Sequence, residues 1–258
     1  DLALSYTGTD AVGIRNGLGG AVARFEFADG SSVTHSELIG AAADGVIAGT
    51  DAAGTFTVMG GRTNDSATVS AAGAVISGGR GDDAFVATGG GHTYKYSRAD
   101  GQDTITETRN VDPITGLPAA ASRIVFGSDI VSGDVSLAVD NGLALRIGPT
   151  AGDTVRLVNF DPQNALDPLP AVDRFEFADG TALTMAELLA RGFDFAGTSG
   201  DDSIAGTSVV DRFAASAGND TLSGGGGADV YHLASASGLD VIVDTAAAGS
   251  GDDTLIGG

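Results

Sequence analysis

Large apolar side chains recur at every ninth position between residues 197 and 232. They are Ile204, Phe213, Leu222 and Tyr231, and most of the residues between them are small or polar. Each is the centre of a three-residue segment, which is enough for a very short strand with one side chain facing inward. The pattern therefore predicts a stack of short strands around a narrow apolar interior.

The same nine-residue period organises the polar residues. Residues 197–232 divide without a gap into GTSGDDSIA, GTSVVDRFA, ASAGNDTLS and GGGGADVYH, which follow the template G-G-x-G-x-D-x-U-x, where U is a large apolar residue. Glycine at positions one, two and four allows positive φ and a tight turn whose carbonyls can point inward. Aspartate at position six supplies a hard carboxylate oxygen, which suits Ca²⁺. The position-six residues are Asp202, Asp211, Asp220 and Asp229.

Two such units complete one turn of a flattened spiral, so turns on the same edge recur every 18 residues. This spacing pairs Asp202 with Asp220. It likewise pairs Asp211 with Asp229 on the other edge, and we expect each pair to share a Ca²⁺ across one gap between turns. Without a cation the facing carboxylates would repel one another. We therefore expect calcium binding to be coupled to folding.

A second and more degenerate array lies upstream. GGRGDDAFV (78–86) matches the template, and GGRTNDSAT (60–68) places Asp65 18 residues before Asp83 on the same edge. The unit between them, at 69–77, has lost its glycines and its aspartate. We expect one edge of this array to bind calcium and the other to be mostly structural.

Two further segments extend the repeat pattern. The units at 40–48 and 49–57 keep the apolar position but carry glycine at position six, and we assign them to the first roll. AGSGDDTLI (248–256) begins a third array, with Asp253 at position six.

Outside the arrays, alternation of apolar and polar residues predicts strands. The segments are RIVF (123–126), VSLAV (135–139), LALRI (143–147) and TVRLV (154–158). Asn141-Gly142 is a hairpin signal between two of them. The stretches 110–121 and 161–170 are predicted to be loops.

A longer repeat contains the small ones. RFEFADG occurs at 24–30 and again at 174–180, in each case with a strand followed by an Asp-Gly turn. Each copy precedes a short helix that opens with a capping box, at Thr34 with Glu37 and at Thr184 with Glu187. The predicted organisation is the end of one cassette at 1–39, a first β-roll at 40–98, a β-rich connector at 99–196, a second β-roll at 197–235, and the end of that roll with the start of a third array at 236–258.

Composition narrows the function classes. The 258 residues include 41 Gly, 29 Asp, 5 Glu, 12 Arg and one Lys, with no Cys or Trp, and the formal net charge is −21. The sequence has no basic patch to neutralise phosphates, so we expect no nucleic-acid binding. No apolar run approaches the roughly 18 residues that a spanning helix needs. The lack of an initiator Met and of a signal peptide predicts a segment of a longer protein.

The nonapeptides resemble the RTX (repeats-in-toxin, haemolysin-type calcium-binding) family, and the RFEFADGTALTMAELL region resembles the haemolysin-type calcium-binding-related domain found between such arrays. The resemblance implies an all-β, right-handed parallel β-roll, export through a type I secretion apparatus, and folding outside the cell on meeting Ca²⁺. It also implies that turn carbonyls join the aspartates as ligands. Those carbonyls belong to Gly78, Arg80, Gly81, Gly197, Ser199, Gly200, Gly224, Gly226 and Gly227.

After each array the family pattern continues as G-x-D-x-I-x-D/E. This chain has GQDTITE (101–107) and GLDVIVD (238–244). Asp103, Glu107, Asp240 and Asp244 either complete a terminal calcium site or lie on an exposed strand face.

No constellation for catalysis is evident. None of the three histidines lies in an H-E-x-x-H helix, and no cysteine or G-x-S-x-G nucleophile is present. We therefore expect no enzymatic activity. Three classes remain: a calcium-binding region of a secreted adhesin, toxin or exoprotein, an accessory module of a secreted polysaccharide-acting enzyme, and a self-assembling surface-layer segment. We favour the first, at the cell surface or outside the cell, with neighbouring cassettes or surface glycans as possible partners.

Overall fold

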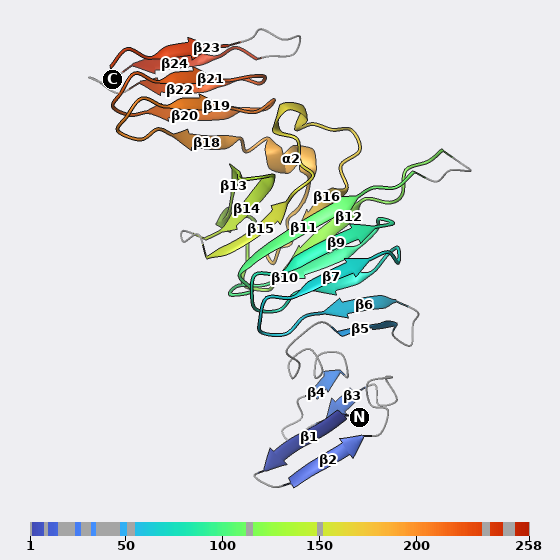
Figure 1. The fold of residues 1–258 in the computed structure, drawn as a ribbon. Helices are drawn as coiled ribbons and strands as arrows, with labels where there is room; N and C mark the ends of the chain where they lie inside the picture. The colour runs from blue at the N-terminus through green and yellow to red at the C-terminus, as the bar shows by residue number, and fades with distance from the viewer. Residues whose placement is uncertain are drawn as a thin grey trace.

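The computed structural model shows a stack of β-strands arranged along one long axis (Figure 1). It describes the strand backbones at 2–7, 10–14, 24–26, 32–34 and 47–50, and then residues 55–257 without 112–115, 149–151, 234–237 and 245–250. Within these ranges, regular structure other than strand is confined to one short α-helix and two 3₁₀ turns. The expected all-β, parallel β-roll fold is confirmed.

The N-terminal strands form two antiparallel hairpins. β1 (Leu2–Thr7) pairs with β2 (Asp10–Ile14), and β3 (Arg24–Glu26) pairs with β4 (Ser32–Thr34). The second hairpin is the first copy of RFEFADG with its following strand. The short helix and capping box expected after it, with Glu37, lie outside the described residues.

The first roll and the connector share two sheets. One sheet has the strand order β17-β16-β12-β10-β8-β6-β5 and the other β13-β14-β15-β11-β9-β7. The strands are β5 (Ile47–Thr50), β6 (Phe56–Met59), β7 (Ser66–Val69), β8 (Val75–Ser77), β9 (Ala84–Thr88), β10 (Thr93–Tyr96), β11 (Gln102–Thr108), β12 (Ser122–Phe126), β13 (Val135–Val139), β14 (Leu143–Ile147), β15 (Asp153–Leu157), β16 (Val172–Glu176) and β17 (Ala182–Thr184). From β6 to β12 the chain alternates between the sheets, so two units make one coil, as the 18-residue spacing predicted.

Two features of this part differ from the sequence prediction. The parallel ladder begins at β6, because β5 pairs with β6 in antiparallel orientation. The segment 47–50 therefore does not form a coil of the roll, in keeping with the glycine that replaces aspartate at position six of these units. The predicted boundary at residue 99 also interrupts neither sheet, since β11 pairs in parallel with β9 and β12 pairs in parallel with β10.

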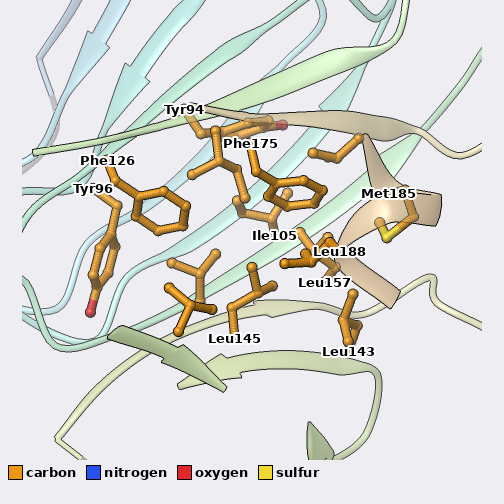
Figure 2. Close-up of a cluster of buried hydrophobic side chains, with 14 of the residues drawn as sticks. Tyr94, Tyr96, Ile105, Phe126, Leu143, Leu145, Leu157, Phe175, Met185 and Leu188 are labelled. Carbon is orange, nitrogen blue, oxygen red and sulfur yellow. The ribbon is translucent and has the colours of Figure 1, made fainter. Parts of the chain in front are cut away.

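The connector supplies most of the apolar core. Figure 2 shows Phe126, Phe175 and Leu145 directed into one interior, with Met185 and Leu188 of helix α2 (Met185–Leu189) at its edge. Helix α2 begins at Thr184, whose capping box with Glu187 is formed as predicted. None of the helices in the described ranges is long and apolar enough to cross a membrane.

The expected hairpin in the connector is also present. β13 and β14 pair in antiparallel orientation, and Asn141 and Gly142 in their turn have φ of 48° and 132°. Asparagine and glycine tolerate these left-handed values best, which explains the dipeptide at this point.

The second roll is a narrower two-sheet stack. Its sheets have the orders β18-β20-β22-β24 and β19-β21-β23, all parallel. The strands are β18 (Phe193–Ala196), β19 (Ser203–Ala205), β20 (Asp211–Ala215), β21 (Thr221–Ser223), β22 (Val230–Leu233), β23 (Val241–Val243) and β24 (Thr254–Gly257). The predicted start of a third array is thus a further strand of the second roll, because β24 pairs with β22.

A ladder of aromatic rings forms the spine of the second roll. The ring centroids of Phe195 and Phe213 lie 5.3 Å apart, and those of Phe213 and Tyr231 lie 5.0 Å apart, both pairs stacked. Phe195 also contacts the buried cluster of the connector, so the two cores are continuous. Only a few residues fill this interior, so each contributes a large share of its burial.

We expect Phe213→Ala to lower the free energy of unfolding of the folded protein by about 3–5 kcal/mol, because Phe213 is fully buried between two rings. Val241→Ala is the matched control, since Val241 is half exposed on β23 of the same roll and should cost about 0.5 kcal/mol or less. Chemical denaturation followed by circular dichroism measures both. Equal losses would show that the ring ladder does not hold the roll together.

Candidate metal sites

The stacked coils place the position-six aspartates in three rows. The rows are Asp65–Asp83–Asp103, Asp202–Asp220–Asp240 and Asp211–Asp229–Asp253. The first interval in each row is 18 residues, as the sequence predicted, and the second is 20, 20 or 24 residues. The structure therefore brings Asp103, Asp240 and Asp253 into rows that sequence spacing alone had defined only as pairs.

Within each row one carboxylate oxygen is used to join the coils. The backbone N–H of each aspartate donates to Oδ1 of the aspartate in the next coil, over 2.8–3.2 Å. This contact fixes the carboxylate against the turn before it. It leaves the other oxygen, Oδ2, to be satisfied in some other way.

The first aspartate of each row is satisfied by its own turn. Oδ2 of Asp65, Asp202 and Asp211 accepts from the backbone N–H at position two of the same unit. These donors are Gly61, Thr198 and Thr207, at 2.7, 2.6 and 2.5 Å. The two threonine hydroxyls also donate to the same carboxylates.

The middle aspartate of each row is not satisfied. Among the described residues, no hydrogen-bond partner exists for Oδ2 of Asp83, Asp220 or Asp229, and each of these side chains is 0–1 % exposed. A buried carboxylate oxygen without a donor is costly, and nearly all such atoms in proteins are paired. Its natural partner is a cation, and an oxygen of this kind is a ligand that Ca²⁺ prefers.

Glycine leaves room beside these oxygens. A Cβ at Gly78 would collide with Oδ2 of Asp83, and a Cβ at Gly224 would collide with Oδ2 of Asp229. The position-one carbonyls of Gly78 and Gly224 in turn lie against Gly60 and Gly206 of the preceding coils, close to the carboxylates there. Each turn is thus a small cradle lined by carbonyl and carboxylate oxygens, and these residues fit a bound Ca²⁺.

The other turn residues named from the family resemblance occupy the same loops. The carbonyls of Gly81 and Gly200 lie against the α-carbons of Gly101 and Gly218 in the next coils. The N–H groups of Arg80 and Gly226 donate to carbonyls of the preceding coil, those of Gly61 and Thr207, at 3.0 Å. Three residues complete this set: Gly197 lies beside Oδ2 of Asp202, Ser199 is exposed in the first turn of the second roll, and Gly227 (φ 117°) packs against the Val209 backbone.

The G-x-D-x-I-x-D/E segments differ between the two rolls. Asp103 and Glu107 are buried, which excludes an exposed strand face for them. Asp240 is half-buried at the end of its row, and Asp244 is exposed. In each segment the first acidic residue accepts the N–H of the aspartate in the preceding coil.

Burial raises the pKa of several row carboxylates. Asp103 has a pKa of about 8, caused first by burial and further by the charges of Asp83, Asp100 and Asp82. Burial also raises the pKa of Asp211 to about 7 and that of Asp229 to about 6, and in Asp229 the charges of Asp253 and Asp244 add to it. A cation placed among these groups would favour their ionised forms and oppose these shifts.

A second ladder of polar residues runs beside two of the rows. The side-chain oxygens of Asn64 and Asp82 accept from the N–H groups of Asp82 and Gln102. Those of Asp201 and Asn219 accept from Asn219 and Leu239 in the same way. We did not predict this ladder, although the signal was present in the units, each of which has Asn or Asp at position five on this edge.

A cavity lies apart from these turns, in the connector. It has a volume of about 90 Å³ and is lined mainly by apolar residues such as Leu157, Phe160 and Met185, with Glu107 and Asn159 among its polar groups. Pockets for small molecules usually have about 300–1,000 Å³. The turns, rather than this cavity, therefore carry the chemistry that can be assigned.

We expect Gly224→Ala to lower calcium affinity in the second roll and to cost about 1–3 kcal/mol of stability, because the added methyl group would displace Oδ2 of Asp229 and the Tyr231 hydroxyl. Gly226→Ala is the control, since its nearest contact would be the Ser208 carbonyl oxygen at an ordinary 3.5 Å. Calcium titrations followed by circular dichroism compare the two. Indistinguishable midpoints would show that the Gly224 cradle holds no ion.

In the presence of a chelator we expect the free energy of unfolding of the folded part of the chain to rise as the pH falls from about 8 to about 4. The raised pKa of Asp103, on β11 in the sheets shared with the connector, means that the folded, cation-free protein binds a proton more tightly than the unfolded chain, whose aspartates keep a pKa near 3.8. This stabilisation is complete below pH 3.8 and is lost as the pH rises through about 8. Thermal unfolding in EDTA across this range tests it, with saturating Ca²⁺ as the control. Stability that is flat or increasing from pH 5 to 8 in EDTA would contradict it.

Comparison with known families gives a match in the second roll. Residues 206–235 and 243–258 match the model of the RTX calcium-binding nonapeptide repeat, with four copies. The upstream units at 60–86 lie outside the matched residues. No curated protein matches the chain. The matched segment contains Asp211, Asp220, Asp229 and Asp253 in parallel coils, so this part of the chain consists of RTX calcium-binding nonapeptide repeats.

Proposed function

We propose that this chain is the calcium-binding, folding-competent region of a larger protein that leaves the cell through a type I secretion apparatus and folds outside on meeting Ca²⁺. The observation that carries the proposal is the set of three buried carboxylate oxygens, on Asp83, Asp220 and Asp229, that have no hydrogen-bond partner in the part of the chain that the structure describes. The calcium-binding repeats themselves support a secreted or surface location, since such repeats are typical of proteins of that kind.

The residues that would hold the ions belong to adjacent coils. Oδ2 of the middle aspartate in each row supplies the charge, and the position-one carbonyls of Gly78 and Gly224 supply neutral oxygen. When bound, Ca²⁺ provides the positive charge that the buried oxygens lack. The protein's part is to hold these oxygens in place, through the hydrogen bonds that join Oδ1 to the coil before it.

Folding should depend on the ion because the rows concentrate negative charge. Each row stacks three carboxylates in successive coils, and the second roll has few apolar residues to compensate for their burial. In water the unfolded chain keeps these carboxylates apart and hydrated. A site with an affinity of about 10⁻⁴–10⁻³ M would remain empty in a calcium-poor cytosol and fill outside the cell. The chain would then stay extended for export and become rigid afterwards.

We expect the EDTA-stripped chain to gain β-structure in the second roll on addition of Ca²⁺ but not of Mg²⁺. Asp220→Asn should move the calcium midpoint upward by on the order of tenfold, because it removes a charged ligand worth about 1.5–3 kcal/mol while Oδ1 can still accept the Asp202 N–H. Far-UV circular dichroism during a Ca²⁺ titration follows the transition.

The matched control is Asp194→Asn, which removes the same charge from an exposed side chain that pairs with Arg212 on the surface of the roll. Its calcium midpoint should stay close to that of the unchanged chain. Equal midpoints for the two variants would overturn the assignment of Asp220. A chain that is fully folded in EDTA and indifferent to Ca²⁺ would overturn the proposed function itself.

A further inference from the structure

Two units of the second roll begin with the same three residues but have different surroundings. The units at 197–205 and 206–214 both start Gly-Thr-Ser, and in both the threonine N–H and hydroxyl groups donate to the aspartate at position six. Positions four and five are Gly-Asp in the first unit and Val-Val in the second. The turn at 197–202 is largely exposed, whereas Thr207 and Asp211 in the other turn are 0 % exposed. Another part of the chain therefore covers the second of these turns.

The cover is a segment of the connector, residues 161–165, which we call the seat. It follows β15 and contains a 3₁₀ turn. Ser208 in the covered turn makes two hydrogen bonds to it. Its N–H donates to the Pro162 carbonyl, and its hydroxyl accepts the Ala165 N–H, both over 2.8 Å. The backbone of the seat thus holds position three of the unit from two sides.

A side chain of the seat holds position one of the same unit. Nε2 of Gln163 donates to the Gly206 carbonyl over 2.9 Å. In the next coil the equivalent carbonyl, that of Gly224, lies against Gly206 in the coil before it. No such coil precedes Gly206, because the residue 18 positions earlier, Leu188, belongs to helix α2. The amide of Gln163 therefore stands where a preceding turn of the roll would otherwise be.

Val209 explains why this unit departs from the repeat template. The template has glycine at position four, and the unit at 197–205 keeps it as Gly200. Val209 is 7 % exposed and packs with the buried apolar cluster of the connector. Glycine could not make this contact, since it has no side chain to bury. The loss of the template glycine is thus accounted for by docking on the connector.

The next turn on this edge, at 224–229, is built directly on the seated turn. The Gly226 N–H donates to the Thr207 carbonyl over 3.0 Å, and the Asp211 N–H donates to Oδ1 of Asp229 over 2.9 Å. Asp229 is one of the aspartates whose buried Oδ2 has no hydrogen-bond partner in the described part of the chain. The seat therefore fixes a turn that in its turn fixes this oxygen.

The two aspartate rows of the second roll start in these two different turns. The docked row starts in the seated turn, and the free row starts in the exposed one. The hydrogen bonds of the exposed turn go to residues of the second roll itself. The docked row is Asp211–Asp229–Asp253 and the free row is Asp202–Asp220–Asp240.

Building on the calcium-binding function proposed above, we propose that the seat positions the turns of the docked row before calcium arrives, so that this row binds Ca²⁺ first and more tightly than the free row. Gln163, Ser208 and Val209 are then positioning residues. They lie outside both rows and act through the turn that they hold. Calcium-dependent folding of the second roll would accordingly start at the connector, on one edge.

The physical reason is preorganisation. A turn that becomes ordered only when an ion binds loses conformational entropy at that moment, and this loss lowers the affinity. The seated turn is held by the connector, which has a large apolar core of its own. Its residues are therefore already ordered when the ion binds, whereas the exposed turn at 197–202 has to be ordered by the binding itself.

Calcium titrations of the whole chain, followed by far-UV circular dichroism, test the proposal with one row impaired at a time. Asp229→Asn impairs the docked row and Asp220→Asn impairs the free row, and in both variants Oδ1 can still accept the N–H from the preceding coil. We expect the calcium midpoint of Asp229→Asn to be roughly threefold or more above that of Asp220→Asn. Equal midpoints, or the reverse order, would overturn the proposal and leave calcium-dependent folding intact.

Gln163→Met separates positioning from general stability, because it removes the donor to Gly206 and keeps an unbranched side chain of similar length. We expect it to raise the calcium midpoint about threefold in the Asp220→Asn chain, which relies on the docked row. In the Asp229→Asn chain, which relies on the free row, it should change nothing. The matched control is Gln102→Met, the same change at the only other glutamine, which is exposed on β11. Equal shifts for Gln163→Met in the two chains, or none in either, would overturn the proposal.

Val209→Gly restores the repeat template at position four and removes the contact with the connector core. If the regularity of the repeat set the affinity, this variant would bind Ca²⁺ at least as tightly as the unchanged chain. With the seat, its midpoint in the Asp220→Asn chain should rise roughly threefold or more. A midpoint that stays the same or falls would contradict the proposal. The absence of any calcium-induced transition in the unchanged chain would overturn the proposed function as well.

Discussion

A buried carboxylate oxygen without a hydrogen-bond donor is the constraint on which the rest of this structure depends. The roll stacks aspartates in successive coils, and the bond from each backbone N–H to Oδ1 of the next coil forces those side chains to remain in the turns. The glycines follow from the same requirement, because any Cβ at Gly78 or Gly224 would occupy the space beside the free oxygen. Sequence repeat, turn geometry and cation binding are therefore consequences of one arrangement of atoms.

The two rolls meet this constraint to different degrees. The first shares its sheets with the connector, whose large apolar core includes Phe126, Phe175 and Leu188, and one of its edges carries Ala74, His92 and Ser122 in place of aspartates. The second has a small core and aspartates on both edges. We infer that the first roll and connector form the part of the chain that depends less on Ca²⁺. The second roll would depend on it for most of its stability.

Much of the fold was predictable because its determinants are local. The nine-residue period located β7, β9, β20 and β22, the Asn141-Gly142 turn located a hairpin, and Thr184 with Glu187 marked the start of α2. The third aspartate of each row was not predicted, because it follows a connection of variable length. Intervals of 20 and 24 residues bring Asp103, Asp240 and Asp253 into the rows, and no local pattern encodes which strand a chain joins after a longer loop. The role of His92 in joining successive coils was not predicted for a different reason. A histidine at position six does not match a template that has aspartate there.

The residue at position two differs among the turns that hold the row aspartates. Thr198 and Thr207 turn their N–H and hydroxyl groups onto the aspartate of their own unit, so that its oxygens are occupied. Gly79 and Gly225 instead adopt φ of 85° and 97°, values that threonine avoids, and the aspartates of their units keep a free Oδ2. Position two does not decide this alone, because Gly61 closes its turn onto Asp65, and Ser216 stands at position two in the unit of Asp220, whose Oδ2 has no partner among the described residues. What separates the turns is their place in the row: the first aspartate is closed by its own turn, and the middle aspartate keeps a free Oδ2.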